Sequence, residues 1–449
     1  MDKKLLPVAA SLIPGLLIAW LRPLGLTSFQ AIVLAAIVTV ILWWIVKIVD
    51  RTVASVILLA VFCLSGQVPL RTVFSFPISE NFWLIVFSFL FSQGIANSGL
   101  ADKLLLPILE RWANTSGKVV LSMLLLIAVM VPIIPQPFSR IIIISLIYAR
   151  FFDRLGLEPD LKASFMFGIY SFSIGINMLF LRGDIILNTA LLAIGDVSMG
   201  EETWMKYMTV PGLVLVALSA LLFAFVFRKE LRRFPAAVRP TREKIRLSGR
   251  EKLWLSFVVL TVVFWALEDV HGLSGTYIVI GASVLMVPLG LLKLPEDLKT
   301  VNLKLLVFLT AAFSIGGTLK ACGAAAVLFA PFASLLPDHF SPLYAMIVVL
   351  SSMALHMLLG SNITTLSVVV PALMSLSVVP QQEVLLLLIY IAVCGHFLLP
   401  FHSVLLLLGE GNDYFSSKVT LSYGVPATGL ILLAVPTVFL GWWAMMGLL

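Results

Sequence analysis

Hydroxyl and amide side chains gather at one point of an otherwise apolar sequence, in the stretch GSNITT at residues 360–365. Ser361, Asn362 and Thr364 offer oxygens that suit a small cation, and hydroxyls and amides at the start of a helix suit the oxygens of an anion. Apolar sequence of helical length flanks the stretch on both sides, so we expect the tip of a helical hairpin. The pattern predicts a site for an anion and its coupling ion; the alternative is that these side chains cap and join packed helices.

A second interruption, PIIPQPFSR at residues 132–140, has different chemistry. Its three prolines restrict the backbone and remove hydrogen-bond donors, which leaves Gln136, Ser139 and Arg140 as the polar groups. An arginine at membrane depth is costly unless it faces protein or water, so it is a functional candidate. Arg140 is therefore predicted to attract an anion; the alternatives are that it extends to the membrane surface or pairs with a carboxylate.

A third interruption places Asn177, Arg182, Asp184 and Asn188 within the apolar stretch 173–192. A guanidinium binds a carboxylate or sulfate through two parallel hydrogen bonds, so Arg182 is a candidate anion ligand. Asp184 is a candidate for coupling to a proton or cation. The alternative is a structural pair between Arg182 and Asp184.

A fourth interruption surrounds Pro400 in the segment 394–415 and carries His396, His402 and Ser403. A histidine at the break of a membrane helix is a credible substrate contact or proton carrier. We therefore predict substrate contacts at His402 and Ser403, with His402 also a coupling candidate. The alternative is that the histidines only satisfy hydrogen bonds inside the protein.

Composition identifies an integral membrane protein. Of the 449 residues, 60% are hydrophobic and only 12% are charged, whereas soluble domains have roughly 25% charged residues. The net charge of +7 does not indicate nucleic-acid binding, because the basic residues occupy short loops between apolar segments. Three cysteines without metal-binding spacing indicate packing residues. We expect no cofactor other than a coupling ion.

The apolar segments predict an all-α polytopic membrane protein with about 11 transmembrane helices and two re-entrant hairpins. Both halves repeat one plan, a spanning helix, an interrupted pair and an interrupted span, which is typical of inverted-repeat transporters. The expected parts are N-terminal scaffold helices at 1–81, a first repeat at 82–227 with hairpin 118–153 and broken helix 162–195, a basic linker at 228–252, and a second repeat at 253–449 with hairpin 341–378 and broken helix 382–409.

Charge asymmetry predicts the orientation of the chain. With a cytoplasmic N-terminus and the C-terminus outside, most of the 30 Lys and Arg residues fall on the cytoplasmic side. The outside receives only Arg22, Arg71, Lys206 and Lys320. This distribution follows the positive-inside rule. We therefore expect a multi-pass protein of the cell membrane.

Four local patterns resemble the divalent anion/sodium symporter family of the ion transporter superfamily. They are ILWWIVKIV (41–49), SGLADKL (98–104), SNITT (361–365) and FLLPFHS (397–403) followed by GEGNDYF. The resemblance implies a homodimer that moves a di- or tricarboxylate or sulfate together with Na⁺, by an elevator motion of a transport domain against a scaffold. It also implies that Ser361 and Asn362 contribute to a sodium site and that Ser403 keeps the hydroxyl of a family threonine.

The sequence departs from the family in the first hairpin, where Gln136 to Arg140 replace a Ser-Asn-Thr signature, and in the first broken span, where Arg182 and Asp184 replace small hydroxyl residues. Two alternatives therefore stay open: a proton-coupled anion transporter, or a sodium/proton or arsenite-type transporter of the superfamily. A remote alternative is a rhomboid-like serine protease, because HGLSGTY (271–277) places Gly-x-Ser-Gly around Ser274 at the start of a helix, with His356, His396 or His402 as the candidate base. We otherwise expect no enzymatic activity.

Overall fold

The structure is a computed structural model that describes residues 5–46, 48–133, 137–235, 247–301, 303–324, 327–328, 336–337, 339–376 and 382–449. All regular elements among these residues are helices, as the composition predicts. The all-α prediction is confirmed.

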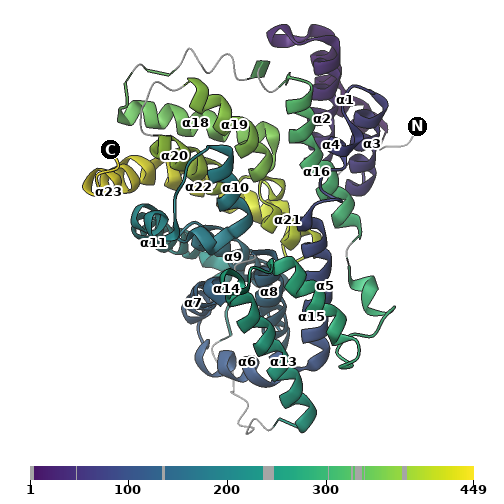
Figure 1. Cartoon of the computed structure of the whole chain (residues 1–449), viewed down its shortest axis with the longest axis vertical. Helices are drawn as coiled ribbons and strands as arrows, with labels where there is room; N and C mark the ends of the chain where they lie inside the picture. The colour runs from purple at the N-terminus through teal and green to yellow at the C-terminus, as the bar shows by residue number, and fades with distance from the viewer. Residues whose placement is uncertain are drawn as a thin grey trace.

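The N-terminal helices form one body with a helix from the second half of the chain. Helix α1 (Leu5–Leu21) packs on α2 (Ser28–Val46), and α2 packs on α3 (Arg51–Leu64). Helix α16 (Leu303–Ala321) packs against α2, α3 and the short α4 (Leu70–Val73). These helices lie together at the upper right of Figure 1.

A second group lies at the lower end of the same side of the molecule (Figure 1). Helix α5 (Glu80–Ser98) packs along α15 (Gly275–Met286), which also contacts α13 (Gly249–Ala266). Helix α6 (Leu100–Trp112) follows α5 after a turn at Gly99. These elements and the N-terminal body flank the helices that surround the site.

Two helix pairs occupy the predicted hairpins. In the first, α7 (Ser116–Ile133) and α8 (Pro137–Arg154) are joined by a hydrogen bond from the Tyr148 hydroxyl to Ser122 Oγ at 2.8 Å. In the second, α18 (Pro342–Leu359) ends at Gly360, whose positive φ of 73° reverses the chain into α19 (Asn362–Leu376). A Cβ atom at Gly360 would lie 2.9 Å from the Phe401 ring, so glycine meets both a conformational and a steric demand.

Two helices are interrupted where the sequence predicts breaks. The first comprises α9 (Pro159–Asn177), the 3₁₀ turn η2 (Leu181–Asp184) and α10 (Ile185–Ile194); the second comprises α20 (Gln382–Cys394), the 3₁₀ turn η4 (Pro400–His402) and α21 (Val404–Gly411). Every residue of α20 from Val384 to Cys394 is buried, and α9 is buried along most of its length. Protein therefore surrounds both breaks, as irregular backbone at membrane depth requires.

The order of elements repeats. Helices α5 and α16 each have 19 residues and are followed by a glycine with positive φ: Gly99, at 66°, directly after α5, and Gly323, at 73°, two residues after the end of α16. Each half continues with a hairpin, a broken helix and a long helix, α11 (Glu201–Val226) or α22 (Ser417–Ala434). The repeated plan agrees with the sequence; the inverted relation of the halves and the domain boundaries stay predictions.

Three stretches of the described chain are long and apolar enough to cross a membrane: α11, α18 and the run Ser417–Met445. That run comprises α22, the π-helical η5 (Val435–Phe439) and α23 (Leu440–Met445). The remaining short elements are η1 (Pro23–Gly25), α12 (Arg228–Leu231), α14 (Glu268–His271) and η3 (Asp297–Thr300). The total of about 11 crossings, and the re-entrant nature of the hairpins, stay predictions.

Candidate functional site

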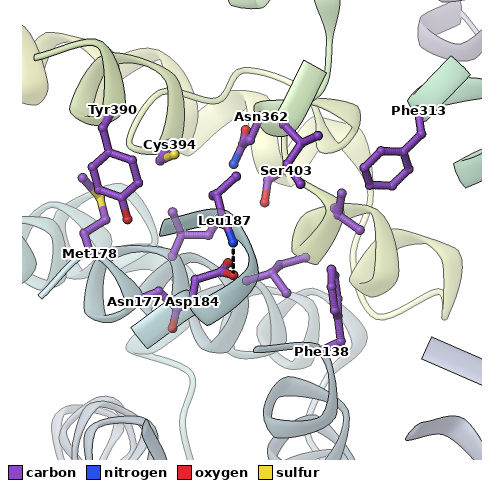
Figure 2. A pocket seen from close by; sticks show the side chains of 14 residues that line it. Phe138, Asn177, Met178, Asp184, Leu187, Phe313, Asn362, Tyr390, Cys394 and Ser403 are labelled. Carbon is purple, nitrogen blue, oxygen red and sulfur yellow. Dashed lines mark hydrogen bonds between the residues drawn. The ribbon is translucent and has the colours of Figure 1, made fainter. Parts of the chain in front are cut away.

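A small cavity lies where both hairpins, both helix breaks and α16 converge (Figure 2). Its volume is about 50 Å³, enough for roughly three to five water molecules. The lining residues are Phe138, Ile174, Asn177, Met178, Asp184, Leu187, Phe313, Asn362, Ile363, Tyr390, Cys394, Ser403, Val404 and Leu405. Segments far apart in sequence thus contribute to one mostly apolar site with a few polar groups, the usual composition of a small-ligand pocket.

The polar lining comes from both halves of the chain. Asn177 and Asp184 flank the first break, Asn362 begins α19 at the tip of the second hairpin, and Ser403 follows the second break. Figure 2 shows the Asp184 carboxylate accepting a hydrogen bond from the Leu187 backbone N–H, at 3.0 Å. This bond caps α10 and fixes the carboxylate at the cavity wall.

The backbone of the first break is held by side chains from neighbouring elements. Asn188 Nδ2 donates to the carbonyl oxygens of Asn177, Phe180 and Leu181 at 3.1 to 3.3 Å. Trp204 Nε1 donates to the Met178 carbonyl at 3.1 Å, and Thr209 donates to that of Leu179 at 2.8 Å. These bonds replace those that a continuous helix would make, so unwound backbone persists inside the protein.

Arg140 completes this set from the first turn of α8. Its guanidinium is buried, with 1% of the residue exposed, and Nη2 donates to the Gly183 carbonyl and to Asn177 Oδ1, both at 2.6 Å. Asp184 is close enough to Arg140 for a charge–charge interaction. Arg140 does not line the cavity, although Asn177 and Asp184 do.

The second break is held by His402. Its Nδ1 accepts hydrogen bonds from the backbone N–H groups of Leu398 and Leu399 at 3.0 and 3.1 Å, which assigns the ring proton to Nε2. The His402 carbonyl in turn accepts from His356 Nε2 on α18 at 3.0 Å. His402 therefore connects the break to the second hairpin as a neutral imidazole, and its predicted role as a proton carrier stays a prediction.

Several buried polar atoms of the second half have no hydrogen-bond partner among the described residues. The atoms are Ser361 Oγ, Asn362 Oδ1, Thr365 Oγ1, His356 Nδ1, His396 Nδ1 and His402 Nε2. The three imidazole rings lie together, with centroid separations of 5.1 to 6.2 Å. Unpaired buried polar groups are costly, so the atoms of this cluster at the hairpin tip can form hydrogen bonds with a ligand. The carbonyls of the first break, in contrast, already accept hydrogen bonds from side chains.

The predicted site residues differ in their position relative to the cavity. Asn362, Ser403 and Asp184 line the cavity, and Ser361 is buried beside Asn362 at the hairpin tip. Gln136 and the side chains of Ser139 and Thr364 lie outside the described residues. Arg140 and His402 do not line the cavity; their contacts are given above.

Arg182 is not among the residues that line the cavity. Its side chain is exposed, and its backbone N–H donates to Glu201 Oε2 at 3.1 Å. Glu201 also accepts from the Leu181 N–H at 3.1 Å, so this carboxylate caps the 3₁₀ turn η2. Arg182 is therefore not part of the cavity lining in this structure, and its role as an anion ligand stays a prediction.

Tyr390 and Cys394 line the cavity without having been predicted as site residues. The Tyr390 hydroxyl donates to Asn188 Oδ1 at 2.6 Å and so connects the two broken helices. The sequence could have indicated Tyr390 as a site residue, because it is a polar aromatic residue inside the apolar run 384–394. Cys394 was predicted to be a packing residue, and its spacing in the sequence gives no sign of a cavity.

Ser274 has a structural environment that disfavours the protease alternative. Its Oγ accepts from the Thr276 backbone N–H at 3.3 Å as the N-cap of α15, and it also contacts Glu80. The nearby His271 uses Nε2 on the Phe264 carbonyl at 2.7 Å and Nδ1 on the Leu273 N–H at 3.1 Å. Both imidazole nitrogens of His271, the histidine nearest to Ser274 in the sequence, are thus engaged elsewhere and do not activate the serine.

Comparison with known proteins agrees with this architecture. The family model described as the sodium:sulfate symporter transmembrane region matches residues 2–449. The chain is 24% identical over 300 residues to the putative malate transporter YflS of Bacillus subtilis (strain 168), covering 63% of each chain. It is 26% identical over 258 residues to the chloroplastic dicarboxylate transporter 1 of Spinacia oleracea, covering 54% of this chain and 45% of that one. The chain thus matches less than two thirds of the length of either relative.

Proposed function

Because the chain belongs to the sodium:sulfate symporter transmembrane family, also called the divalent anion/sodium symporters, we propose that it is a secondary active transporter of a small dicarboxylate. Malate and related dicarboxylates are the first candidates, since two relatives are described as malate and dicarboxylate transporters. Sulfate and tricarboxylates are the next candidates. The protein is a multi-pass membrane protein, and the proposal concerns what it carries and how.

The single observation that carries the proposal is the cavity between the two hairpins and the two breaks. Asn177, Asn362 and Ser403 supply amide and hydroxyl groups to a lining that is otherwise mostly apolar, and such groups orient carboxylate oxygens. The cavity volume of about 50 Å³ suits a few water molecules, so a dicarboxylate enters only if the lining moves. The hairpin α18–α19, which turns at Gly360 beside Phe401, is the candidate moving part.

The proposed coupling ion is Na⁺, bound near the unpaired oxygens of Ser361 and Asn362. Hydroxyl and amide oxygens are suitable ligands for a hard cation. One observation favours a second candidate, coupling to protons: Asp184 is the only carboxylate among the described residues that line the cavity. A protonated Asp184 would oppose an incoming anion less than a charged one.

Alternating access by an elevator motion fits the arrangement of the helices. Helices α1–α4 and α16 form one body, and the hairpins and broken helices gather around the cavity beside it. In the proposed mechanism the second group carries the site past the first. The homodimer, the cytoplasmic N-terminus and the external C-terminus belong to this proposal as well, on the basis of family resemblance and of loop charges.

The proposal is tested by the thermal stability of the purified protein in detergent, with sulfate, succinate, malate, citrate and arsenite, each in Na⁺ and in K⁺ at pH 6 and pH 8. A ligand at about a hundred times its dissociation constant adds roughly 2.7 kcal/mol to the folded state. We expect malate or succinate to stabilise the protein in Na⁺ only. A response that follows pH and ignores Na⁺ would move the coupling to Asp184 or His402.

Two variants make the test specific. Asn362→Ala removes a cavity amide and is expected to abolish the ligand response, because its side chain lines the site. Ser274→Ala, at the N-cap of α15 and outside the cavity lining, is expected to leave the response intact. Stabilisation by arsenite and by no carboxylate or sulfate would contradict the proposed substrate class, and equal effects of the two variants would contradict the proposed site.

A further inference from the structure

Arg140 is a buried cation that does not line the cavity but contacts a residue that does. Its Nη2 donates to Asn177 Oδ1 and to the Gly183 carbonyl, both at 2.6 Å. Asn177 lines the cavity and Arg140 does not. A buried guanidinium held by hydrogen bonds and a nearby carboxylate, here Asp184, is well compensated. The charge of Arg140 is therefore balanced by groups of the protein.

The chemistry of this contact fixes the orientation of the Asn177 amide. An amide group has one accepting oxygen and one donating NH₂, and at ordinary resolution the two ends are distinguished only by their partners. A guanidinium can only donate, so the amide oxygen must face Arg140. The NH₂ end is then the only end of Asn177 that remains for a ligand in the cavity.

We propose that Arg140 is a positioning residue that makes Asn177 an N–H donor toward the cavity and so selects an anion, without touching the anion itself. This inference rests on the proposed anion transport. In this proposal the first hairpin selects an anion through the Asn177 amide, which Arg140 of α8 holds in place. A second contact of the same guanidinium, on the Gly183 carbonyl, holds the 3₁₀ turn η2 that carries Asp184.

The inference predicts how variants of Arg140 differ. Arg140→Lys keeps a buried donor for Asn177 Oδ1 and should retain anion affinity within a few-fold. Arg140→Met removes the donor, frees the amide to turn, and should weaken affinity by about tenfold or more, as expected for one hydrogen bond to a charged ligand. The loss should be equal for a dicarboxylate and for the matching monocarboxylate, because the variant removes one hydrogen bond to a carboxylate that both ligands carry, and Arg140 itself contacts no ligand charge.

Asn177→Asp is the second test. It keeps an oxygen for Arg140 and adds an ion pair, so folding should persist, but it removes the N–H donor. We expect anion affinity to fall at least as far as in Arg140→Met. The double variant Arg140→Met with Asn177→Ala should lose no more affinity than the larger single loss, because both changes disable the same donor.

The measurement is the dissociation constant of malate, succinate and a monocarboxylate analogue for each purified variant, with the melting temperature without ligand as a check of folding. Additive losses in the double variant, or a loss confined to the dicarboxylates, would show direct contact between Arg140 and the anion and overturn the inference. Full affinity in Asn177→Asp would overturn it too. If the native chain responds to no anion, the proposed function fails and the inference fails with it.

Discussion

Individual side chains at the site act mainly by holding backbone and neighbouring groups in place. The side-chain amide of Asn188 donates to three carbonyls of the first break, and its oxygen accepts a hydrogen bond from the Tyr390 hydroxyl. His402 has the equivalent function in the second break, with two backbone N–H groups on Nδ1. The residues that line the cavity are thus supported by polar residues one contact further from it, which is how rigid binding sites are built.

Tyr390→Phe tests this support at the scale of one hydroxyl. The change leaves Asn188 Oδ1 buried without its 2.6 Å partner, which should destabilise the protein by about 1–3 kcal/mol. Because Tyr390 also lines the cavity, malate affinity should fall as well. Melting temperature and ligand titration measure the two effects.

The matched control is Tyr423→Phe. Tyr423 is equally buried and its hydroxyl donates to the Ser219 carbonyl at 3.0 Å, but it does not line the cavity. It should lose stability without losing affinity. An unchanged affinity in Tyr390→Phe would remove Tyr390 from the site.

At the scale of elements, the first broken helix depends on a close approach of backbone that only glycine allows. A Cβ atom built on Gly183 would lie 2.2 Å from the Asn177 carbonyl oxygen, because η2 folds back onto the end of α9. This overlap involves backbone on both sides, so no side-chain rotation relieves it. The turn, and with it the position of Asp184, should therefore be intolerant of any side chain at residue 183.

We expect Gly183→Ala to destabilise the protein by about 1–3 kcal/mol or more, as for other overpacked sites, and to abolish the ligand response. Gly281→Ala is the control, since a Cβ there meets no atom within 4 Å. Alanine in the interior of α15 should be neutral or slightly stabilising. Melting curves with and without malate decide the comparison, and normal binding by Gly183→Ala would contradict the assigned geometry.

Sequence reasoning found the elements better than the contacts between them. The breaks near Asn177 and Pro400, and the hairpin tip at Gly360, were predictable because polar or proline residues interrupt apolar runs of membrane length. The positions of Arg182 and Arg140 were not predictable from such runs. The Arg182 side chain is exposed in the 3₁₀ turn η2, whereas Arg140 reaches Asn177 from α8. The sequence contains no signal for the direction of either side chain.

At the scale of the whole molecule, one ion pair joins the N-terminal body to the broken helices. Arg51 Nη2 on α3 lies 2.7 Å from Glu410 Oε2 on α21, and Arg51 also lies over the Phe308 ring of α16 at 5.1 Å. The pair borders a cleft of about 900 Å³ between α2, α3, α9 and α21. In an elevator motion α21 moves relative to α3, so this contact must break in every cycle.

Crosslinking tests that requirement. With cysteines at both positions, Arg51→Cys and Glu410→Cys, a bifunctional thiol reagent should stop malate uptake into proteoliposomes, because it ties α3 to α21. Gln30→Cys supplies the control: Gln30 Nε2 donates to the carbonyl of the native Cys322 at 2.8 Å, so the crosslink joins α2 to α16 within one body. That crosslink should leave uptake at the level of the native chain treated with the same reagent. Persistent uptake after complete Arg51–Glu410 crosslinking would mean that α3 and α21 stay together and that smaller hairpin movements alone open the cavity.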